Sequence, residues 1–309
     1  MTEDLYLGID GGGSKTRALI TDRSGATLGE GIATSSNYHR VGFAGATAAI
    51  ETAIPAAFAQ AGRAPVRFAA ATFGLAGVDR PADRELFERW LAGTQLAARY
   101  SIVNDAQLVL AAGAPDGWGV ALICGTGSMC YGVSPSGAVA RAGGWGYLVG
   151  DEGSGYNIAV RAIQFATQTA DGRSFAKGLL ELVLDYWKIE RPEDLVSCLY
   201  DPETTLAKIA GLAPGVLALA ESDPYARRLL DGAAAALAHH VDVVVKKLAL
   251  ERPPIALAGG LLCVSAALRE AVVGRATQAL GVVHVVEQPA VGAIALARHL
   301  ADSRMLTGH

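Results

Sequence analysis

The sequence predicts an α/β protein with two domains, and three features of the chain lead to this fold class. Over roughly the first 115 residues, short apolar strands alternate with helical stretches, the pattern of an α/β layer. A hairpin with a glycine-rich turn occurs near the start of the chain and again within residues 118–142. The turn-rich run Ala-Gly-Ala-Pro-Asp-Gly at 112–117 lies just before the second hairpin and is expected to mark the domain boundary.

The first domain is expected to span residues 1–115 and to hold a sheet with helices packed on it. Its predicted strands lie near 5–10, 16–22, 27–33, 67–73 and 100–104, and its predicted helices near 42–62 and 80–92. Pro55 lies inside the first of these helices and is expected to kink or split it, because proline removes a backbone donor and crowds the preceding turn.

The second domain is expected to span residues 116–289 and to carry helical insertions. After the hairpin at 118–142, almost everything from 151 to 250 has a helical pattern, interrupted by Gly and Pro turns, and should cover one face of the second sheet. Strands near 255–258 and 282–287 then flank a helix near 264–279. The closing helix, 290–309, is expected to pack back onto the first domain.

Composition favours a cytoplasmic globular protein that acts on small molecules. The 309 residues are 51% hydrophobic, and the net charge of −4 comes from dispersed charges, which gives no case for a nucleic-acid or membrane partner. The four cysteines show no CxxC spacing and are expected to be free core thiols. The adjacent His239 and His240 cannot place both rings on one helix face, which disfavours a metal site there.

The segment LYLGIDGGGSKT, Leu5–Thr16, is suited to a nucleotide phosphate. An apolar strand ends at Asp10, which can hold a metal ion, and the glycine turn offers backbone N–H groups together with Ser14 and Lys15. It is not a P-loop, because Ser14 separates the glycines from Lys15, and no helix follows to make a dinucleotide fold. A plain glycine-rich hairpin is the alternative, which the second turn at Gly125–Ser128 makes less attractive.

Together the motifs resemble the superfamily of acetate and sugar kinases, chaperones and actin, and within it the BadF/BadG/BcrA/BcrD family that contains N-acetylglucosamine kinase. The motifs that carry the resemblance are Asp10–Thr16, Asn37, Asn104-Asp105, Gly125–Ser128, Gly143–Gly146, Gly150–Gly155 and Ala258–Gly260. The resemblance implies two ribonuclease-H-like, or actin-like ATPase, domains with a nucleotide and sugar cleft between them. It also implies ATP-dependent phosphorylation of the 6-hydroxyl of an amino sugar, with N-acetylglucosamine as the first expectation.

The same resemblance implies a role for each motif. Asp105 would be the catalytic base, although a plain helix N-cap is the alternative. Asp10 would hold Mg²⁺, partly through water. ATP would be bound by Gly12, Gly13, Ser14, Lys15, Thr16, Thr126, Gly127, Gly259 and Gly260. The sugar would be bound by Asn37, Asp105, Ser128, Gly144, Trp145 and Asp151.

Some alternatives stay open at this level. Asn37 also suits a turn asparagine, Gly259-Gly260 a tight turn, and Glu152 a first-turn helix acid. Met129 follows the second glycine turn where the animal N-acetylglucosamine kinases that this stretch resembles carry asparagine, so a glucosamine kinase is the alternative.

Two other classes of function compete with a kinase. An ATPase activator of a reductase or dehydratase would hold an iron–sulfur cluster through cysteines, and Cys124 and Cys130 are a poor pair for that. A non-catalytic sugar sensor lacks support from a helix-turn-helix segment. A homodimer is compatible with the resemblance, but no segment identifies its interface.

Overall fold

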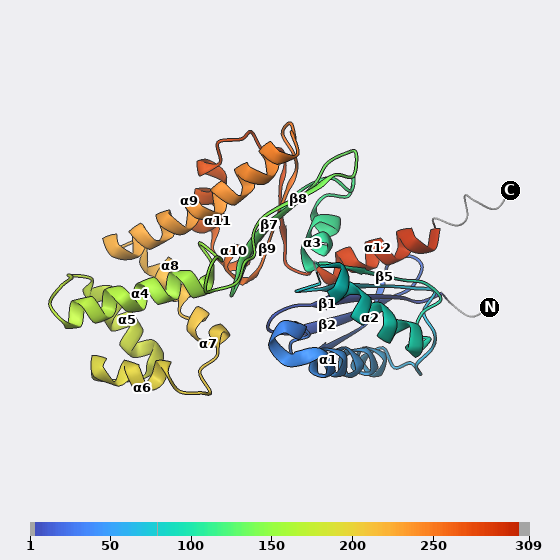
Figure 1. Ribbon diagram of the computed structural model, residues 1–309, viewed down its shortest axis with the longest axis horizontal. Coiled ribbons are helices and arrows are strands. Elements are labelled where there is room, and N and C mark those ends of the chain that lie inside the picture. The colour runs from blue at the N-terminus through green and yellow to red at the C-terminus, as the bar shows by residue number, and fades with distance from the viewer. Residues whose placement is uncertain (1–3, 79, 303–309) are drawn as a thin grey trace. The chain divides into compact units, whose positions relative to one another are not determined.

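The protein, described here by a computed structural model over residues 4–78 and 80–302, consists of two compact units. The first unit comprises the chain up to Pro115 together with the segment from Gln288 onward, and the second comprises Asp116–Glu287. Each unit contains one five-stranded mixed sheet with helices packed against it (Figure 1). The α/β fold class expected from the sequence is confirmed.

The first unit is built on the strand order β3-β2-β1-β4-β5. Strands β1 to β3 form an antiparallel meander, whereas β4 and β5 run parallel to β1. Its elements are β1 Tyr6–Gly11, β2 Thr16–Thr21, β3 Thr27–Ala33, α1 Tyr38–Gln60, β4 Ala70–Leu75, α2 Pro81–Thr94, β5 Tyr100–Val103, α3 Asp105–Gly113 and α12 Ala290–Asp302.

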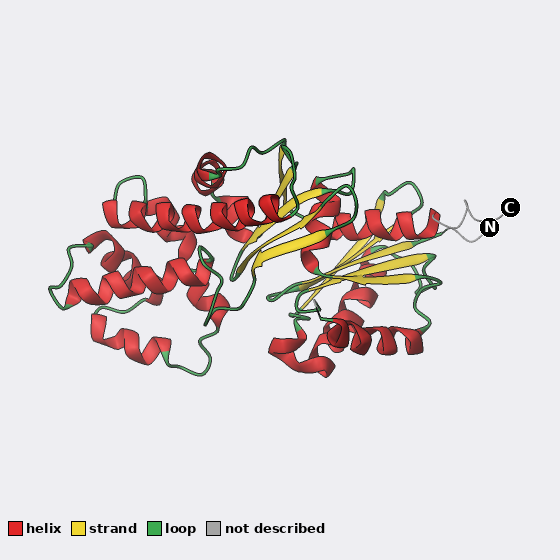
Figure 2. Cartoon of the chain, turned by 45° about the horizontal axis from the view of Figure 1, so that its top comes forward, coloured by secondary structure: helices red, strands yellow, loops and turns green. Residues whose placement is uncertain are grey.

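Both faces of the first sheet are covered by helices (Figure 2). Side chains alternate along β1, so Leu7 and Ile9 join one buried cluster with residues of α1 and α2, while Tyr6 joins another with Ile294 of α12. Helix α12 also packs against α3 and β4. The segment after residue 288 therefore completes the core of the sheet with which the chain begins.

Helix α1 departs from helical geometry at Gly42 rather than at Pro55, so the expected position of the kink is wrong. Gly42 has φ +73° and ψ +165°, whereas Pro55 lies within the regular part of the helix. Pro55 is on the exposed side, where water can satisfy the carbonyl that loses its partner.

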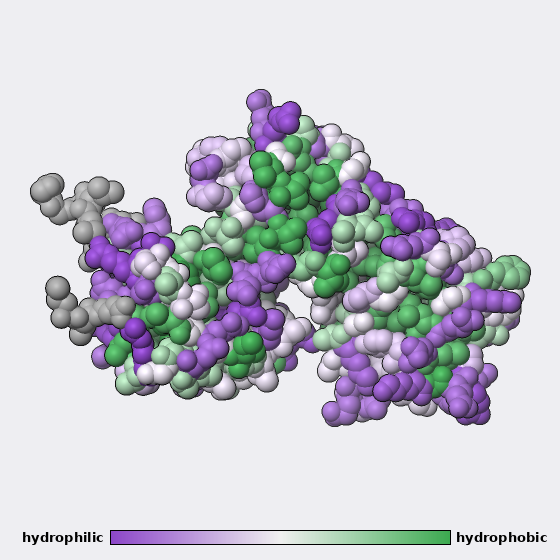
Figure 3. All heavy atoms as spheres, turned by 180° about the vertical axis from the view of Figure 1, so that it is seen from behind, coloured by the Kyte–Doolittle hydropathy of each residue, from purple (hydrophilic) through white to green (hydrophobic). Residues whose placement is uncertain are grey.

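By length and composition, α1 is apolar enough to cross a membrane. However, its buried residues, among them Ile50 and Ala53, pack against the first sheet as part of the core. In the space-filling view, hydrophilic residues are spread over the visible faces of both units, with hydrophobic patches between them (Figure 3). Helix α1 is thus a core helix of the first unit.

The second sheet repeats the topology of the first in the order β10-β9-β6-β7-β8. Strands β6 to β8 are the antiparallel meander, and β9 and β10 run parallel to β6. Its strands are β6 Gly119–Cys124, β7 Ser128–Val133, β8 Val139–Gly143, β9 Ile255–Ala258 and β10 Val283–Val286. The duplicated hairpin seen in the sequence is therefore part of a duplicated sheet.

Helices between β8 and β10 build a large core on one face of the second sheet, as expected. They are α4 Gly155–Ala170, α5 Lys177–Trp187, the 3₁₀ helix η1 Pro192–Asp194, α6 Leu195–Leu199, α7 Leu206–Ala210, α8 Ala213–Leu219, α9 Pro224–Lys247, α10 Gly260–Val264 and α11 Ala266–Arg275. The helix expected at 264–279 corresponds to α11, and the short helix α10 before it was not expected. The Ser265 side chain caps α11 by accepting the N–H of Leu268 at 3.2 Å, which a continuous helix would not allow.

Candidate functional site

The first glycine turn joins β1 to β2 and is closed by a hydrogen bond from the N–H of Gly12 to the carbonyl of Lys15 at 3.0 Å. Ser14 and Lys15 are exposed at its tip. Thr16 is fully buried, and its hydroxyl donates to the carbonyl of Thr34 at 2.7 Å, so its side chain anchors the base of the turn. Ser14, Lys15 and the turn backbone are the groups left facing outward.

Gly11, at the end of β1, has no room for a side chain. Sequence reasoning did not single out this glycine. A Cβ at Gly11 would lie 2.3 Å from Ser36 Oγ and 2.6 Å from Leu75 Cδ2. Gly12 and Gly13 have more room. The carbonyls of the turn are held from outside, since Ser35 Oγ donates to Gly12 and the Arg40 guanidinium to Gly13.

Asp10 is the penultimate residue of β1 and lies partly buried beside the turn. Burial raises its pKa to about 6, although the nearby cations Arg17 and Lys15 lower it. A buried carboxylate that is costly to ionise is stabilised by a bound cation, so this position fits a magnesium ligand.

Within the described ranges, 4–78 and 80–302, no group of three or more His, Cys, Asp or Glu side chains is placed to hold a metal ion. Magnesium typically takes only one or two carboxylates and completes its shell with water and phosphate oxygens. The residues present therefore fit an ion that arrives with a nucleotide.

Asn37 is the N-cap of α1. Its Oδ1 accepts the N–H of His39 at 3.2 Å, and its own N–H donates to Ser35 Oγ. The side-chain oxygen of Asn37 thus has the local capping role of a turn asparagine. Its side-chain nitrogen, Nδ2, is the group suited to donate to a hydroxyl.

Asp105 is the first residue of α3, directly after β5. Asn104, not Asp105, caps this helix, because Asn104 Oδ1 accepts the N–H of Gln107 at 2.9 Å. A carboxylate in the first turn is also stabilised by the helix dipole. The structure therefore assigns the capping role to Asn104, and the N-cap alternative for Asp105 is wrong.

Asp10 and Asp105 lie at the same edge of the first sheet. Gly11 pairs with Leu75 on β4, and Gly74 pairs with Val103 on β5, so the carboxyl ends of three parallel strands meet there. Two strand spacings separate β1 from β5, about 10 Å. Ligands of α/β sheets bind outside the carboxyl ends of strands, which makes this edge a candidate site.

The second glycine turn joins β6 to β7 and is held by the start of α4. Gly125 and Thr126 accept the N–H groups of Gly155 and Tyr156 at 2.8 and 3.3 Å. Gly259 lies against the end of β6, where a Cβ would come within 2.4 Å of the carbonyl oxygen of Cys124, and its φ is +92°. Next to it Gly260 has open space around its Cα. The structure thus brings the predicted nucleotide residues of the second unit together.

The residues predicted to bind the sugar from the second unit lie beside this turn. A Cβ at Gly127 would lie 2.8 Å from Asp151 Oδ2, and the Asp151 carboxylate accepts the N–H groups of Ser128 and Gly146. Burial raises the pKa of Asp151, while those hydrogen bonds lower it. Its φ of +58° is a strained left-handed conformation that Asp tolerates better than most residues.

Trp145 is 68% exposed and is not a core residue. The Arg141 guanidinium lies 5.3 Å from the centre of its ring. The preceding residue, Gly144, donates its N–H to the carbonyl of Ser128 at 2.9 Å. Ser128 itself is buried, and its hydroxyl donates to the carbonyl of Glu152 at 2.8 Å, so Ser128 holds the loop rather than facing solvent.

Two polar clusters were not predicted from the sequence. In the first unit, the Tyr38 hydroxyl donates to Asp83, which ties the start of α1 to α2, and burial with this contact raises the pKa of Tyr38 to about 12. In the second, His240 of α9 lies 3.4 Å from the Glu152 carboxylate. The only sequence signal for the latter was that His240 lies on the core side of α9, in register with buried positions 237, 241 and 244.

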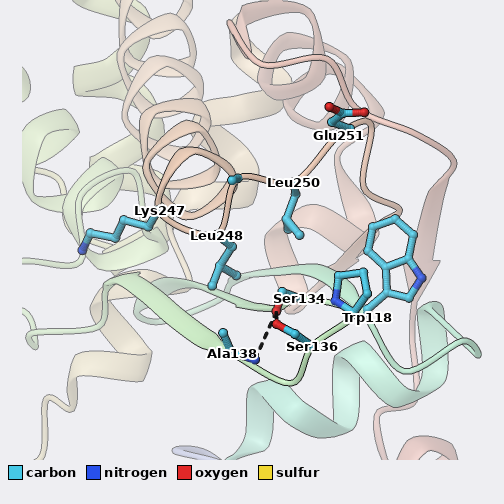
Figure 4. Close-up of a pocket in the computed structure, with 10 residues that line it drawn as sticks. Trp118, Ser134, Ser136, Ala138, Lys247, Leu248, Leu250 and Glu251 are labelled. Atoms are coloured by element: carbon cyan, nitrogen blue, oxygen red, sulfur yellow. Dashed lines mark hydrogen bonds between the residues drawn. The ribbon is translucent and has the colours of Figure 1, made fainter.

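A hollow of about 530 Å³ on the second unit is separate from these residues (Figure 4). It is lined by the β7–β8 turn, including Ser134 and Ser136, and by residues after α9 such as Leu250. The two serine hydroxyls hydrogen bond to each other at 2.9 Å.

The duplicated sheets, each with a glycine turn beside strand ends, define a protein of the actin-like ATPase fold. The model of the BadF/BadG/BcrA/BcrD ATPase family matches residues 7–297, and the chain belongs to this family. The resemblance stated from the motifs is confirmed.

Its relatives include proteins named as sugar kinases. The chain is 34% identical to the N-acetyl-D-glucosamine kinase of Dictyostelium discoideum, over 84% of this chain and 86% of the relative. It is also 34% identical to the N-acetylmuramic acid/N-acetylglucosamine kinase of Clostridium acetobutylicum, over 83% and 85%. The glucosamine kinase GspK of Vibrio cholerae is 31% identical, over 75% and 77%.

A solved structure from Chromobacterium violaceum, provisionally named an N-acetylglucosamine kinase, superposes with a TM-score of 0.78. It is 29% identical, and the match covers 96% of this chain and 100% of that one.

Proposed function

We propose that this protein is an ATP-dependent kinase that phosphorylates the 6-hydroxyl of an amino sugar, with N-acetylglucosamine as the first substrate. The observation that carries this proposal is the 34% identity to two kinases of N-acetylglucosamine over more than four fifths of the chain. The presence of Asp10, Lys15 and Asp105 at the turn and strand ends described above supports a catalytic rather than a binding role.

Asp105 acts as the base in this proposal. The sugar hydroxyl oxygen attacks the γ-phosphorus of ATP, its proton passes to the Asp105 carboxylate, and the bond from the γ-phosphorus to the bridging oxygen breaks to release ADP. Alignment and charge stabilisation lower most of the barrier, and the base contributes about 10²- to 10⁴-fold. The place of Asp105 at the start of α3, directly after β5 at the carboxyl edge of the first sheet, supports this role.

Nucleotide binding is assigned to the two glycine turns together with Gly259 and Gly260. Ser14, Lys15 and the backbone of the first turn would contact phosphate oxygens, and Thr126 and Gly127 would do so from the second turn. Magnesium held by Asp10 would neutralise phosphate charge. The open space at Gly260 supports a flat group approaching the backbone there.

Sugar recognition is assigned to Asn37, Asp105, Gly144, Trp145 and Asp151. The exposed Trp145 ring suits the apolar face of a pyranose, while the Asp151 carboxylate suits hydroxyl donors. Ser128 contributes by fixing the loop through the carbonyl of Glu152.

Glucosamine is the second candidate substrate, and Met129 favours it. A Cβ at Gly144 would lie 3.1 Å from Met129 Cβ, so Met129 packs against Gly144, the neighbour of Trp145. A thioether cannot donate a hydrogen bond to an N-acetyl oxygen.

An activator ATPase that holds an iron–sulfur cluster through cysteines is disfavoured. Cys124 and Cys130 are fully buried on neighbouring strands, and burial raises the pKa of Cys124 to about 12. Cluster ligands are deprotonated thiolates, which such surroundings oppose.

We also propose a cytoplasmic setting, where ATP is available, and a small-molecule substrate without nucleic acid or membrane partners. The dispersed charges and net charge of −4 support this. A homodimer is the proposed oligomeric state, and sedimentation would measure it directly.

The test is ADP release from the purified protein with ATP and Mg²⁺, against N-acetylglucosamine, glucosamine, N-acetylmannosamine, N-acetylmuramic acid and glucose. We expect turnover with one amino sugar, and Asp105→Asn should lower kcat about 10²-fold or more while sugar and ATP still bind. Asp116→Asn, which changes an exposed aspartate at the start of the second unit, is the matched control. ADP release that is independent of sugar, or equal in wild type and Asp105→Asn, would refute the proposal.

A further inference from the structure

Helix α9 packs against the rest of the second unit, and one face of this helix contacts three glycines. A side-chain carbon at any of these glycines would come within 2.9 Å of α9. The contacts join Gly153 to Ala233 and Leu237, Gly143 to His240, and Gly132 to Val244. The spacing 233, 237, 240, 244 is one face of a helix, so α9 sets the positions of all three glycines together.

Two of these glycines bracket the loop that carries Trp145 and Asp151. Gly143 ends β8, with φ +73°, and Gly153 precedes α4, with φ +77°. The loop between them is exposed at Trp145, Leu148 and Val149. Its two ends are therefore fixed by α9, although its centre projects into solvent.

His240 is the polar member of this stripe. It is 8% exposed, and its Nε2 lies 3.4 Å from the Glu152 carboxylate, which belongs to the loop. Its Cε1 edge faces Gly143, where a Cβ would lie 2.9 Å away. One imidazole thus contacts both ends of the loop, by packing at Gly143 and by a polar contact at Glu152.

The ring is suited to a neutral donor. Burial lowers the pKa of His240 and His239 acts in the same direction, whereas Glu152 and Asp151 raise it. Nδ1 is buried and has no hydrogen-bond partner among the described residues. A proton on Nε2 donates to Glu152, whereas a second proton on Nδ1 would be buried without an acceptor.

We propose that His240 is a positioning residue for sugar binding: it holds the loop of residues 143–153, and with it Trp145 and Asp151, through Gly143 and Glu152. This inference rests on the proposed function for the role of the loop. His240 reaches the sugar only through the loop.

The decisive variants are His240→Leu, which keeps an apolar filling but removes the donor, and His240→Gln, whose amide nitrogen can replace Nε2. We expect His240→Leu to raise KM for the sugar about 10-fold or more, with KM for ATP within about twofold of wild type, and His240→Gln to recover most of the loss. His239→Leu, the exposed neighbour on the same helix, is the matched control and should leave both constants unchanged. Equal increases of KM for sugar and ATP, or no rescue by His240→Gln, would overturn the proposal.

A second readout needs neither substrate nor activity. Limited chymotrypsin digestion at the exposed Trp145 and Leu148 should be severalfold faster in His240→Leu than in His239→Leu, because the loop has lost one attachment. If His240→Leu does not fold, Glu152→Gln, which keeps an acceptor, and Glu152→Ala, which does not, replace it in both assays. Faster cleavage in a protein that phosphorylates no sugar would refute the proposed function while the loop attachment stands, and unchanged cleavage would refute the attachment.

Discussion

Replacing Asp10 by asparagine is expected to stabilise the protein at neutral pH while removing its turnover. Burial raises the pKa of Asp10 from 3.8 to about 6, so the folded protein holds this proton more tightly than the unfolded chain. The ionised carboxylate therefore costs stability that grows as pH rises from about 4 to about 6 and is constant above that range. The difference between the two pKa values corresponds to ~3 kcal/mol at neutral pH.

Urea unfolding of Asp10→Asn and wild type at pH 4 and pH 7.5, without Mg²⁺, measures this cost. We expect the variant to be more stable by roughly 2–3 kcal/mol at pH 7.5 and nearly equal to wild type at pH 4, because wild-type Asp10 is then mostly protonated when folded. Asp116→Asn, which lies at an exposed position, should show no such pH-dependent gain. If Asp10→Asn is not more stable than wild type at pH 7.5, the reasoning from burial is wrong. If it is more stable and still turns over at the wild-type rate, the assignment of Asp10 to magnesium is wrong.

Two further predictions use matched variants. Gly259→Ala should lower the free energy of unfolding by about 3 kcal/mol, because residue 259 has a left-handed φ and its Cβ would lie 2.4 Å from the Cys124 carbonyl oxygen. Gly260→Ala should unfold like wild type and affect only KM for ATP, because a Cβ there meets open space. Urea unfolding of the pair checks this, and equal losses in both variants would contradict it. Met129→Asn should raise the ratio of kcat/KM for N-acetylglucosamine to kcat/KM for glucosamine roughly 3- to 10-fold, because the amide can donate one hydrogen bond to the N-acetyl oxygen. Met129→Leu, which adds no donor, should leave this ratio unchanged. An unchanged ratio in Met129→Asn would remove Met129 from the sugar site.

The elements of the sheets could be predicted because their signals are local. Glycine turns between apolar strands placed β1 and β2 to within about a residue, and the repetition of this pattern at 118–142 predicted the second hairpin, β6 and β7. The kink of α1 was placed wrongly, because Pro55 is a local signal whereas its tolerance depends on which side of the helix faces water.

The site was harder to predict where it depends on contacts between distant segments. Position 11 must be glycine because Ser36 and Leu75 leave no room for a side chain there. Neither neighbour can be deduced from the sequence of the turn itself. His240 and Glu152 are far apart in the chain, and only the packing of α9 brings them together. Thr16 and Ser128 belong to the expected motifs, but their buried hydroxyls donate to backbone carbonyls of the protein itself and not to a ligand.

The return of α12 to the first sheet has a consequence for synthesis on the ribosome. Tyr6, Leu19 and Ala70 share their buried cluster with Ala290, Ile294 and Ala297, so this face of the first sheet stays uncovered until residues 290–302 have been translated. The second unit is continuous from Asp116 to Glu287 and can complete its core earlier, because all of its segments emerge before α12 does. The half of the protein that begins the chain is thus the last to finish folding, and its nascent form is the one in need of protection from aggregation.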